Sequence, residues 1–163
     1  MKHRIRSLQL PDLSEAGAVI RRAFAPVAAA FDLTSQNCPG NGAFISLERL
    51  EKDWARGVSM AGLFNGDRMR GFVAWKPRKA SSIWYIEKLA VVPEAQGLGF
   101  GSALLGHAVE HIVLAGGTGI SIGIINDNLA LSAWYERRGF IRTGTRQFPN
   151  LPFLTCYLER ACG

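Results

Sequence analysis

The sequence predicts a single α/β (α+β) domain in which helices cover both faces of a mixed, mostly antiparallel sheet of about six to seven strands. Its 163 residues are the length of one ordinary domain. Hydrophobic residues make up 48% of the chain and charged residues 20%, which is typical of a globular protein. Strand-like and helix-like stretches alternate in the order β-α-α-β-β-β-α-β-α-β-β without a repeat or a linker. We therefore expect residues 1–163 to form one domain.

The first elements are a strand and a helix. Residues 3–9 alternate between polar and apolar side chains, which predicts a short strand. Pro11 and Asp12 are typical of a helix start, and apolar residues at helical spacing follow to about Phe24. We expect Pro26 to end this helix, because proline removes a backbone donor and clashes with the preceding turn.

A loop and a second helix come next. Residues 31–42 are rich in turn-forming residues and predict a long loop, a feature that is often functional in a compact domain. Ser46 is a typical N-cap, and the helix that it begins is expected to end near Gly57.

The middle of the chain predicts three strands. Residues 58–65 and 68–76 flank an Asn-Gly-Asp turn at 65–67, which is typical of a hairpin. Residues 82–92 predict a third, longer strand that ends at Pro93.

The last third predicts two helices and three strands. A glycine-rich loop leads into a helix that extends to about Leu114, and a strand follows at 119–125. Asn126, Asp127 and Asn128 are expected to cap a helix that ends at Gly139 as its C′ residue. Two strands, 140–146 and 153–160, complete the sheet.

Composition narrows the classes of function. The net charge is +6, but the 19 basic residues are scattered, and the densest patch is only residues 76–79. Nucleic-acid-binding domains usually concentrate positive charge on one face, so we expect no nucleic-acid partner. No apolar run reaches the roughly 20 residues of a membrane helix, and the polar start does not resemble a signal peptide. Three cysteines without a CxxC pair indicate neither disulfides nor zinc, so a cytoplasmic protein is expected.

The glycine loop QGLGFG at 96–101 has an unusual composition. A Rossmann fingerprint requires a third glycine where Ser102 or Leu104 stands, and a P-loop requires lysine where His107 stands. What remains is a strand, a glycine loop and a helix N-terminus, which together can bind an anion through free N–H groups. Taken alone, the loop is explained equally well as a flexible turn.

Two motifs together resemble the GNAT acyltransferase superfamily. Gln96-x-x-Gly99-x-Gly101 is similar to its acyl-CoA motif, Q/R-x-x-G-x-G/A, and it follows a strand as in that family. Residues 126–140 resemble the second signature of the family. The matching positions there are Asn128, Ala130, Tyr135, Gly139 and Phe140. The specific resemblance covers about residues 83–142, and the first 80 residues agree only in the order of their elements.

This resemblance implies the GNAT fold, with a splay between the fourth and fifth strands, and acetyl-CoA as co-substrate. The pyrophosphate would lie over the amides of the glycine loop, and the pantetheine arm would pair with the backbone of Leu89 and Val91. Asn128 is expected to cap a helix, to contact the cofactor arm, or both. The implied cofactor-binding residues are Leu89, Ala90, Val91, Gln96, Gly97, Leu98, Gly99, Phe100, Gly101, Ser102, Asn128 and Tyr135.

The resemblance also implies direct attack of a primary amine of a small molecule or peptide on the thioester. Tyr135 is the expected general acid for the leaving thiolate, since a neutral phenol can donate a proton; alternatively it only packs beside Trp134. Glu87 shares strand parity with Leu89 and Val91, and it is either a base for the acceptor ammonium group or the partner of a neighbouring arginine. The alternative function is a non-catalytic acyl-CoA-binding module of the same fold.

Two other groups of residues have weaker support. His107, Glu110 and His111 spell the H-x-x-E-H metal motif. A helical wheel, however, places His107 and Glu110 on the solvent side and His111 at its margin, so we expect no metal. Cys38 is only a weak candidate for a nucleophile, because no histidine partner is evident for it.

The acceptor itself is not specified by any motif. We expect the loop at 31–44 to contribute to its site, with Gln36, Asn37 and Asn41 facing the cleft; alternatively, the loop is an ordinary surface excursion. The expected partners are acetyl-CoA and the amine acceptor, without a nucleic acid or a membrane. We expect the protein to be a monomer or a homodimer.

Overall fold

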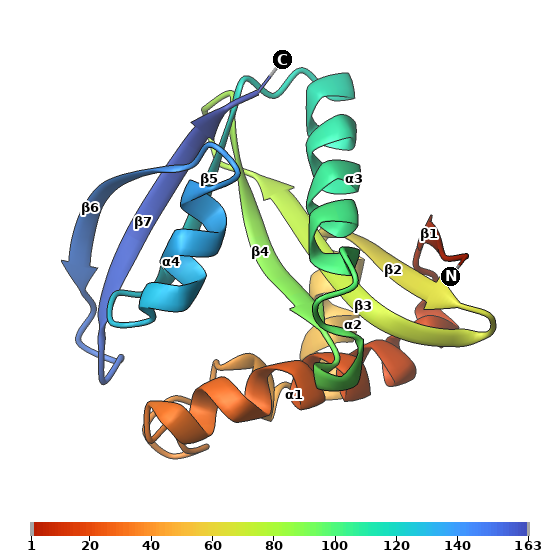
Figure 1. Cartoon of the computed structure of the whole chain (residues 1–163), viewed down its shortest axis with the longest axis horizontal. Coiled ribbons are helices and arrows are strands. Elements are labelled where there is room, and N and C mark those ends of the chain that lie inside the picture. Colours follow the sequence, from red (N-terminus) through yellow and green to blue (C-terminus); the bar gives the residue numbers. More distant parts are fainter. Residues whose placement is uncertain (1, 163) are drawn as a thin grey trace.

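A computed structural model describes residues 2–162, and in this range the chain forms one seven-stranded mixed sheet with four α-helices (Figure 1). The strand order is β1-β2-β3-β4-β5-β7-β6, and every neighbouring pair is antiparallel except β4 and β5. This confirms the predicted fold class. The strands are β1 (Arg4–Ser7), β2 (Ser59–Asn65), β3 (Arg68–Pro77), β4 (Ile83–Val91), β5 (Gly119–Ile125), β6 (Ile141–Gln147) and β7 (Leu154–Ala161). The α-helices are α1 (Leu13–Ala30), α2 (Leu47–Ala55), α3 (Phe100–Leu114) and α4 (Leu129–Glu136).

Helix α1 is longer than the sequence predicts. It continues past Pro26 to Ala30, so the expectation that Pro26 ends the helix is wrong. Pro26 lies on the exposed side, whereas Val27 and Ala28 of the following turn pack into a cluster of apolar residues with Leu33. We attribute the extension to this packing, which offsets the cost of a proline inside the helix.

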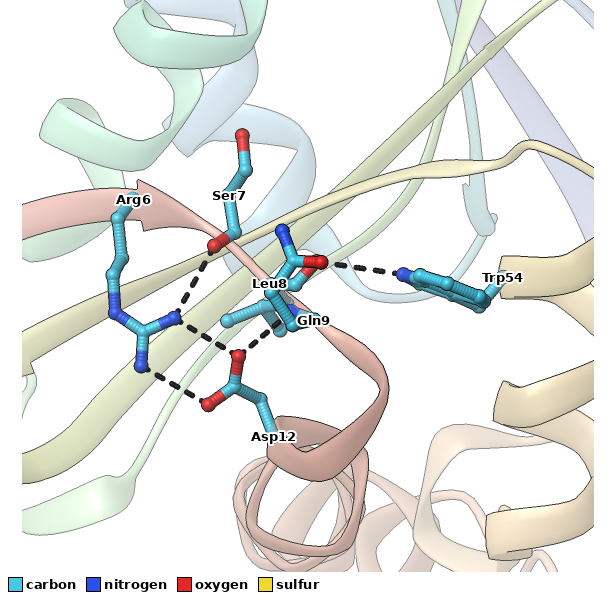
Figure 2. Close-up of polar contacts among 6 residues, drawn as sticks. All are labelled: Arg6, Ser7, Leu8, Gln9, Asp12 and Trp54. Carbon is cyan, nitrogen blue, oxygen red and sulfur yellow. Dashed lines mark hydrogen bonds and ion pairs between the residues drawn. The ribbon is translucent and has the colours of Figure 1, made fainter.

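The N-terminal strand is tied to both of the first helices by polar contacts (Figure 2). The Arg6 guanidinium donates to both carboxylate oxygens of Asp12, at 2.9 and 3.0 Å, just before α1 begins. The backbone N–H of Gln9 donates to the same carboxylate, and the indole N–H of Trp54 in α2 donates to the carbonyl of Leu8. Arg6 lowers the pKa of the Asp12 carboxyl by stabilising its charged form. These contacts fix the edge strand β1 against the two helices.

Strands β2 and β3 form the expected hairpin around Gly66, and β4 pairs antiparallel with β3. The register between β3 and β4 shifts between Ala74 and Trp75, so Glu87 is an extra residue in β4 between the pairs made by Ile86 and Lys88. Such a bulge interrupts the alternation of side chains along a strand. Strand parity alone therefore does not fix the direction of the Glu87 side chain.

Strands β4 and β5 pair over only three residues each, Ile83–Tyr85 with Gly119–Ser121. Beyond these pairs, toward their C-terminal ends, the two strands diverge (Figure 1). The sheet thus has a half built from β1 to β4 and a half built from β5, β7 and β6. The predicted splay between the fourth and fifth strands is confirmed.

Helices cover both faces of the sheet. In Figure 1, α3 and α4 lie in front of it and α2 lies behind, while α1 crosses near the open end of the splay. The main core joins both halves of the sheet, with Phe72, Leu104, Ile120 and Leu158 among its fully buried members. A second, smaller cluster lies at the end of α1 and contains Ala28, Leu33, Cys38 and Ile125.

Two helical details differ from the sequence prediction. His107 was expected on the solvent side of α3, but it is half-buried because its ring and that of His111 pack against Trp75. Helix α4 ends at Glu136 rather than at Gly139. Gly139 follows two residues after the C-cap residue Arg137 and has a φ of +90°, a conformation that favours glycine. Within residues 2–162, no helix combines the length and apolar character that crossing a membrane requires.

Candidate active site

The glycine loop turns from the end of β4 into α3. Gly97 and Gly99 have φ values of +80° and +83°, which L side chains rarely adopt, and Gly99 is the N-cap residue of α3. The first N–H groups of a helix have no acceptor within it, and the helix dipole places partial positive charge there. A Cβ added at Gly97 or Gly99 would meet no atom within 4 Å, so the space above the loop is open. This geometry suits an anion that approaches the bare backbone.

Side-chain contacts of Gln96 and Glu94 hold the start of the glycine loop in place. The Gln96 side-chain amide donates to the carbonyl oxygen of Val91 at 3.1 Å, which ties the start of the loop to the end of β4. Glu94, in the 3₁₀ turn Pro93–Ala95, forms ion pairs with Arg22 of α1 and Arg70 of β3. The Arg22 contact is the main cause of a lowered pKa of the Glu94 carboxyl. The loop is thereby linked to α1 and to β3.

A cavity of about 610 Å³ opens above the loop, between α3 and α4. We call it the glycine-loop cavity. Most of the predicted cofactor-binding residues line it, whereas Ala90 and Leu98 do not. Ala90 is buried and lines a different cavity, and the Leu98 side chain is exposed. The predicted residues that line the glycine-loop cavity are Leu89, Val91, Gln96, Gly97, Gly99, Phe100, Gly101, Ser102, Asn128 and Tyr135.

Five residues that line this cavity were not among the predicted cofactor-binding residues, and two of them, Trp134 and Arg138, contact each other. Arg138, just after α4, donates from Nε and Nη2 to the Ser102 hydroxyl at 3.0 and 2.7 Å, and from Nη1 to the Trp134 carbonyl at 2.9 Å. Its guanidinium lies over the Trp134 ring. The signal was a tryptophan and an arginine four residues apart, a spacing that brings side chains together on a helix. The cavity thus has a fixed cation beside the positive end of α3.

Tyr135 lies where α4 meets the sheet. Its side chain is only 5% exposed, and its ring has edge contacts with Trp134 and Phe140. Burial raises the pKa of the phenol well above its usual value, because the charged phenolate is disfavoured away from water. The phenol is therefore protonated at neutral pH, as a proton donor must be. Asn128 caps the same helix by accepting from the N–H of Leu131 at 3.3 Å, which confirms the predicted N-cap.

A second cavity, of about 590 Å³, lies on the side of α1 and α2. We call it the α1-side cavity, and it is lined by residues from α1, the loop after it, α2, the splayed strands and the β6–β7 connection. Both cavities share lining residues in the gap of the splayed sheet. The shared residues are Leu89, Val91, Gln96, Asn128, Leu131 and Tyr135. The two cavities therefore meet in the gap between β4 and β5, beside Tyr135.

Glu87 lines the α1-side cavity and not the glycine-loop cavity. Its carboxylate oxygen Oε1 lies 2.8 Å from the Lys76 ammonium nitrogen, so its ion-pair partner is a lysine of β3 rather than an arginine. A carboxylate in this place can hold or deprotonate an ammonium group that enters the cavity.

Of the three residues expected to face the cleft from the loop after α1, only Asn41 lines the α1-side cavity. Cys38, Gly40 and Asn41 line the α1-side cavity, whereas Gln36 and Asn37 are exposed and lie outside its lining. The Asn37 side chain is used within its own turn, where it accepts from the N–H of Thr34. Cys38 is buried, and burial raises the pKa of its thiol, which favours the unreactive form.

The H-x-x-E-H residues form no metal-ligand cluster. Among residues 2–162, no three His, Cys, Asp or Glu side chains lie close enough together to hold a metal ion. The rings of His107 and His111 instead contact each other at 4.2 Å between centroids. Burial, with the neighbouring His111 as a smaller cause, lowers the pKa of His107.

Comparison with known proteins gives a family and a fold. The model of the acetyltransferase (GNAT) family matches residues 28–140, which is more than half of the chain. Among curated proteins, a search with this sequence found no match.

Solved structures of acetyltransferases have the same fold along the whole chain. The ribosomal-protein-S18-alanine N-acetyltransferase of Escherichia coli is 19% identical with a TM-score of 0.78, covering 99% of this chain and 95% of that one. The PaiA N-acetyltransferase of Thermoplasma acidophilum, solved in complex with coenzyme A, is 17% identical with a TM-score of 0.78, covering 99% of each chain.

Proposed function

The chain belongs to the acetyltransferase (GNAT) family, and we propose that it transfers an acetyl group from acetyl-CoA to a primary amine of a small molecule or peptide. The amine attacks the thioester carbonyl directly, the carbon–sulfur bond breaks, and the thiolate leaves with a proton. In this proposal residues 1–163 form a single cytoplasmic acyltransferase domain that is active as a monomer or a homodimer.

The observation that supports this proposal best is the pair of cavities that meet in the gap of the sheet. The glycine-loop cavity suits the coenzyme and the α1-side cavity suits the acceptor, and they share Leu89, Val91 and Tyr135. An acetyl group carried along β4 would reach the place where an amine enters from the other side. Holding both reactants in this geometry is a large part of the catalytic effect expected for such a transfer.

The glycine-loop cavity fits the phosphates of coenzyme A. The open space above Gly97 and Gly99, the first N–H groups of α3 and the Arg138 guanidinium together favour a multiply charged anion. Pairing with β5 does not reach Leu89 and Val91, so an extended arm can lie along this edge of β4, where the Val91 carbonyl already accepts from the Gln96 amide. Acetyl-CoA supplies the activated acetyl group when bound there.

Two side chains are assigned to the proton transfers. Tyr135 donates its phenolic proton to the departing sulfur, and solvent restores that proton afterwards. Glu87 holds the incoming ammonium group or accepts its proton, because the amine must lose a proton before it attacks. In this role Glu87 acts either directly or through water.

The test is acetyl-CoA consumption by the purified protein over a panel of small amines, polyamines, aminoglycosides, amino acids and peptides. Amine-dependent release of free thiol, with the acetylated amine identified by mass spectrometry, is the expected result. Binding of acetyl-CoA in calorimetry without turnover of any amine would support the non-catalytic acyl-CoA-binding module instead. A failure to bind acetyl-CoA would refute both functions.

A further inference from the structure

We propose that the acceptor is a hydrophobic α-amino acid, whose carboxylate is bound at Lys88 and whose side chain fills the apolar part of the α1-side cavity. This inference rests on the proposed acetyl transfer and names its substrate class. It follows from three properties of the cavity: its apolar lining, its unbalanced positive charge and one buried hydroxyl without a partner.

The lining is mostly apolar at the end away from the glycine loop. Residues from α1, β5, the β6–β7 connection and β7 form this part, and several of them belong to the second core cluster. Pockets of this kind bind the apolar body of a ligand and use a few polar groups for orientation. The apolar lining residues include Phe24, Val27, Ile124, Phe148, Leu151 and Phe153.

Positive charge exceeds negative charge in the lining. Arg49, Glu87 and Lys88 are the charged residues there, and Glu87 is already paired with Lys76, which lies outside the lining. Arg49 uses its Nε for Asp53 of the next turn. The Lys88 side chain has no hydrogen-bond or ion-pair partner among the contacts described for residues 2–162, whereas its backbone pairs with Ala74 of β3. The cavity therefore presents at least one uncompensated cation.

The environment of Lys88 makes an anionic ligand favourable. Burial lowers the pKa of its ammonium group, because the charged form loses hydration that no protein group replaces. The next contributions come from the charges of Glu87 and Asp53, which favour the ammonium but do not offset burial. A ligand carboxylate would supply the missing partner in a site shielded from water.

The unpartnered hydroxyl of Thr155 is further support for a ligand with a polar group in the same cavity. Its side chain lies on β7, is 7% exposed and lines the cavity, and its Oγ1 has no hydrogen-bond partner in residues 2–162. A buried hydroxyl without a partner is costly, and a ligand atom that reaches it from the cavity would supply the missing bond. Lys88 and Thr155 both line this cavity, so a single ligand that fills it contacts both of them.

The same charges disfavour other amines. A second ammonium group on the acceptor would be repelled by the unpaired Lys88 ammonium, and Glu87 in the lining is already paired with Lys76. Polyamines and aminoglycosides are therefore expected to be poor acceptors. Amines that lack a carboxylate, such as phenethylamine, should enter the apolar part but leave Lys88 unpaired.

The experiment compares matched pairs of amines with the full-length protein: phenylalanine against phenethylamine, and leucine against 3-methylbutylamine. We expect kcat/KM to be at least tenfold higher for the amino acid of each pair. In Lys88→Met this ratio should fall at least tenfold while the KM of acetyl-CoA stays within twofold. The exposed Lys79→Met is the matched control and should leave the ratio unchanged.

A second variant tests the hydroxyl. Thr155→Val removes an unpartnered buried group with little change in shape, so the melting temperature should not fall, whereas the KM of phenylalanine should rise severalfold. Thr145→Val on the exposed strand β6 is its control. A purely structural role of Thr155 would lower the melting temperature and leave that KM unchanged.

The outcomes separate the two proposals. Efficient acetylation of a polyamine or of phenethylamine, with phenylalanine no better, would overturn this inference and leave the acetyltransferase function standing. If no amine is turned over, calorimetry of phenylalanine with the protein saturated in CoA tests the proposed binding site directly. Binding that Lys88→Met weakens at least tenfold would support the site, and no binding would overturn it.

Discussion

The Arg138 guanidinium lies over the indole of Trp134, with its central carbon 3.6 Å from the ring centroid. Three hydrogen bonds, two to the Ser102 hydroxyl and one to the Trp134 carbonyl, hold it in that position. An arginine fixed in this way has lost most of its rotamer freedom before a ligand arrives. It is thus preorganised beside the N-terminus of α3.

We predict that Arg138→Gln raises the Kd of acetyl-CoA at least tenfold, because the glycine-loop cavity loses its fixed cation. The measurement is calorimetry at low and high salt, and the loss should be larger at low salt. Arg137→Gln, at an exposed neighbouring position, is the control and should bind normally. Equal losses in both variants would mean that only net charge matters. Dephospho-CoA shows whether the 3′-phosphate is the group involved.

We predict that Gly99→Val also weakens acetyl-CoA binding at least tenfold, which corresponds to roughly 1.4 kcal/mol. The side chain would project into open space above the loop and hold the phosphates away from the N–H groups. It would also strain a residue with a φ of +83°.

The control for strain alone is Gly116→Val. Gly116 has a φ of +90° at the other end of α3, has open space around its Cβ position and lines neither cavity. Both variants should lose a similar amount of thermal stability, and only Gly99→Val should lose affinity. Unchanged affinity in a folded Gly99→Val protein would refute the phosphate site.

We predict that Tyr135→Phe lowers kcat by about 10²-fold, the scale of a lost general acid, with little change in acetyl-CoA affinity. Steady-state kinetics and calorimetry on the same preparation test this. Turnover within twofold of the wild type would mean that water supplies the proton or that its transfer does not limit the rate.

The raised pKa of Tyr135 also predicts an effect on stability at alkaline pH. The pKa of this phenol is higher in the folded than in the unfolded protein. Its contribution to the free energy of unfolding is therefore complete below the unfolded pKa of about 10 and is lost as the pH rises further. Tyr135→Phe should therefore lose less melting temperature than the wild type between about pH 9 and pH 11. Tyr85→Phe, outside both cavities, should behave like the wild type.

We predict that Glu87→Gln lowers kcat/KM for the amine by about 10²-fold at neutral pH and less at high pH, where more of the amine is already neutral. Lys76→Met separates the catalytic role from the ion pair. It removes the partner of Glu87 but keeps the carboxylate, so activity should persist. Equal losses in the two variants would indicate that the pair is only structural.

Much of the fold was predictable because local signals agreed with the final structure. The Asn65-Gly66-Asp67 turn, the Ser46 cap and the Asn128 cap are short-range features, and each appears as expected. The end of α1 was missed because it depends on contacts made by Val27 and Ala28 with residues distant in the sequence. The effect of Pro26 was therefore overestimated from local rules.

The candidate site also has a part that was predictable from local motifs and a part that was not. The glycine loop and Tyr135 belong to motifs, and most of their predicted neighbours do line the glycine-loop cavity. The acceptor side is assembled from single residues of many elements, such as Arg49, Lys88 and Thr155, and nothing in their spacing brings them together. The bulge at Glu87 shows the same limit, because a register shift depends on the partner strand.

The three-residue joint between β4 and β5 has a consequence for motion. Two half-sheets connected at one end of their shared edge can pivot about that joint, and a ligand arm lying between them would brace both at once. Hydrogen exchange reports such opening directly. Amides at 86–91 and 122–125 should therefore exchange more slowly when acetyl-CoA is bound, whereas those of the hairpin around Gly66, far from the joint, should keep their rates.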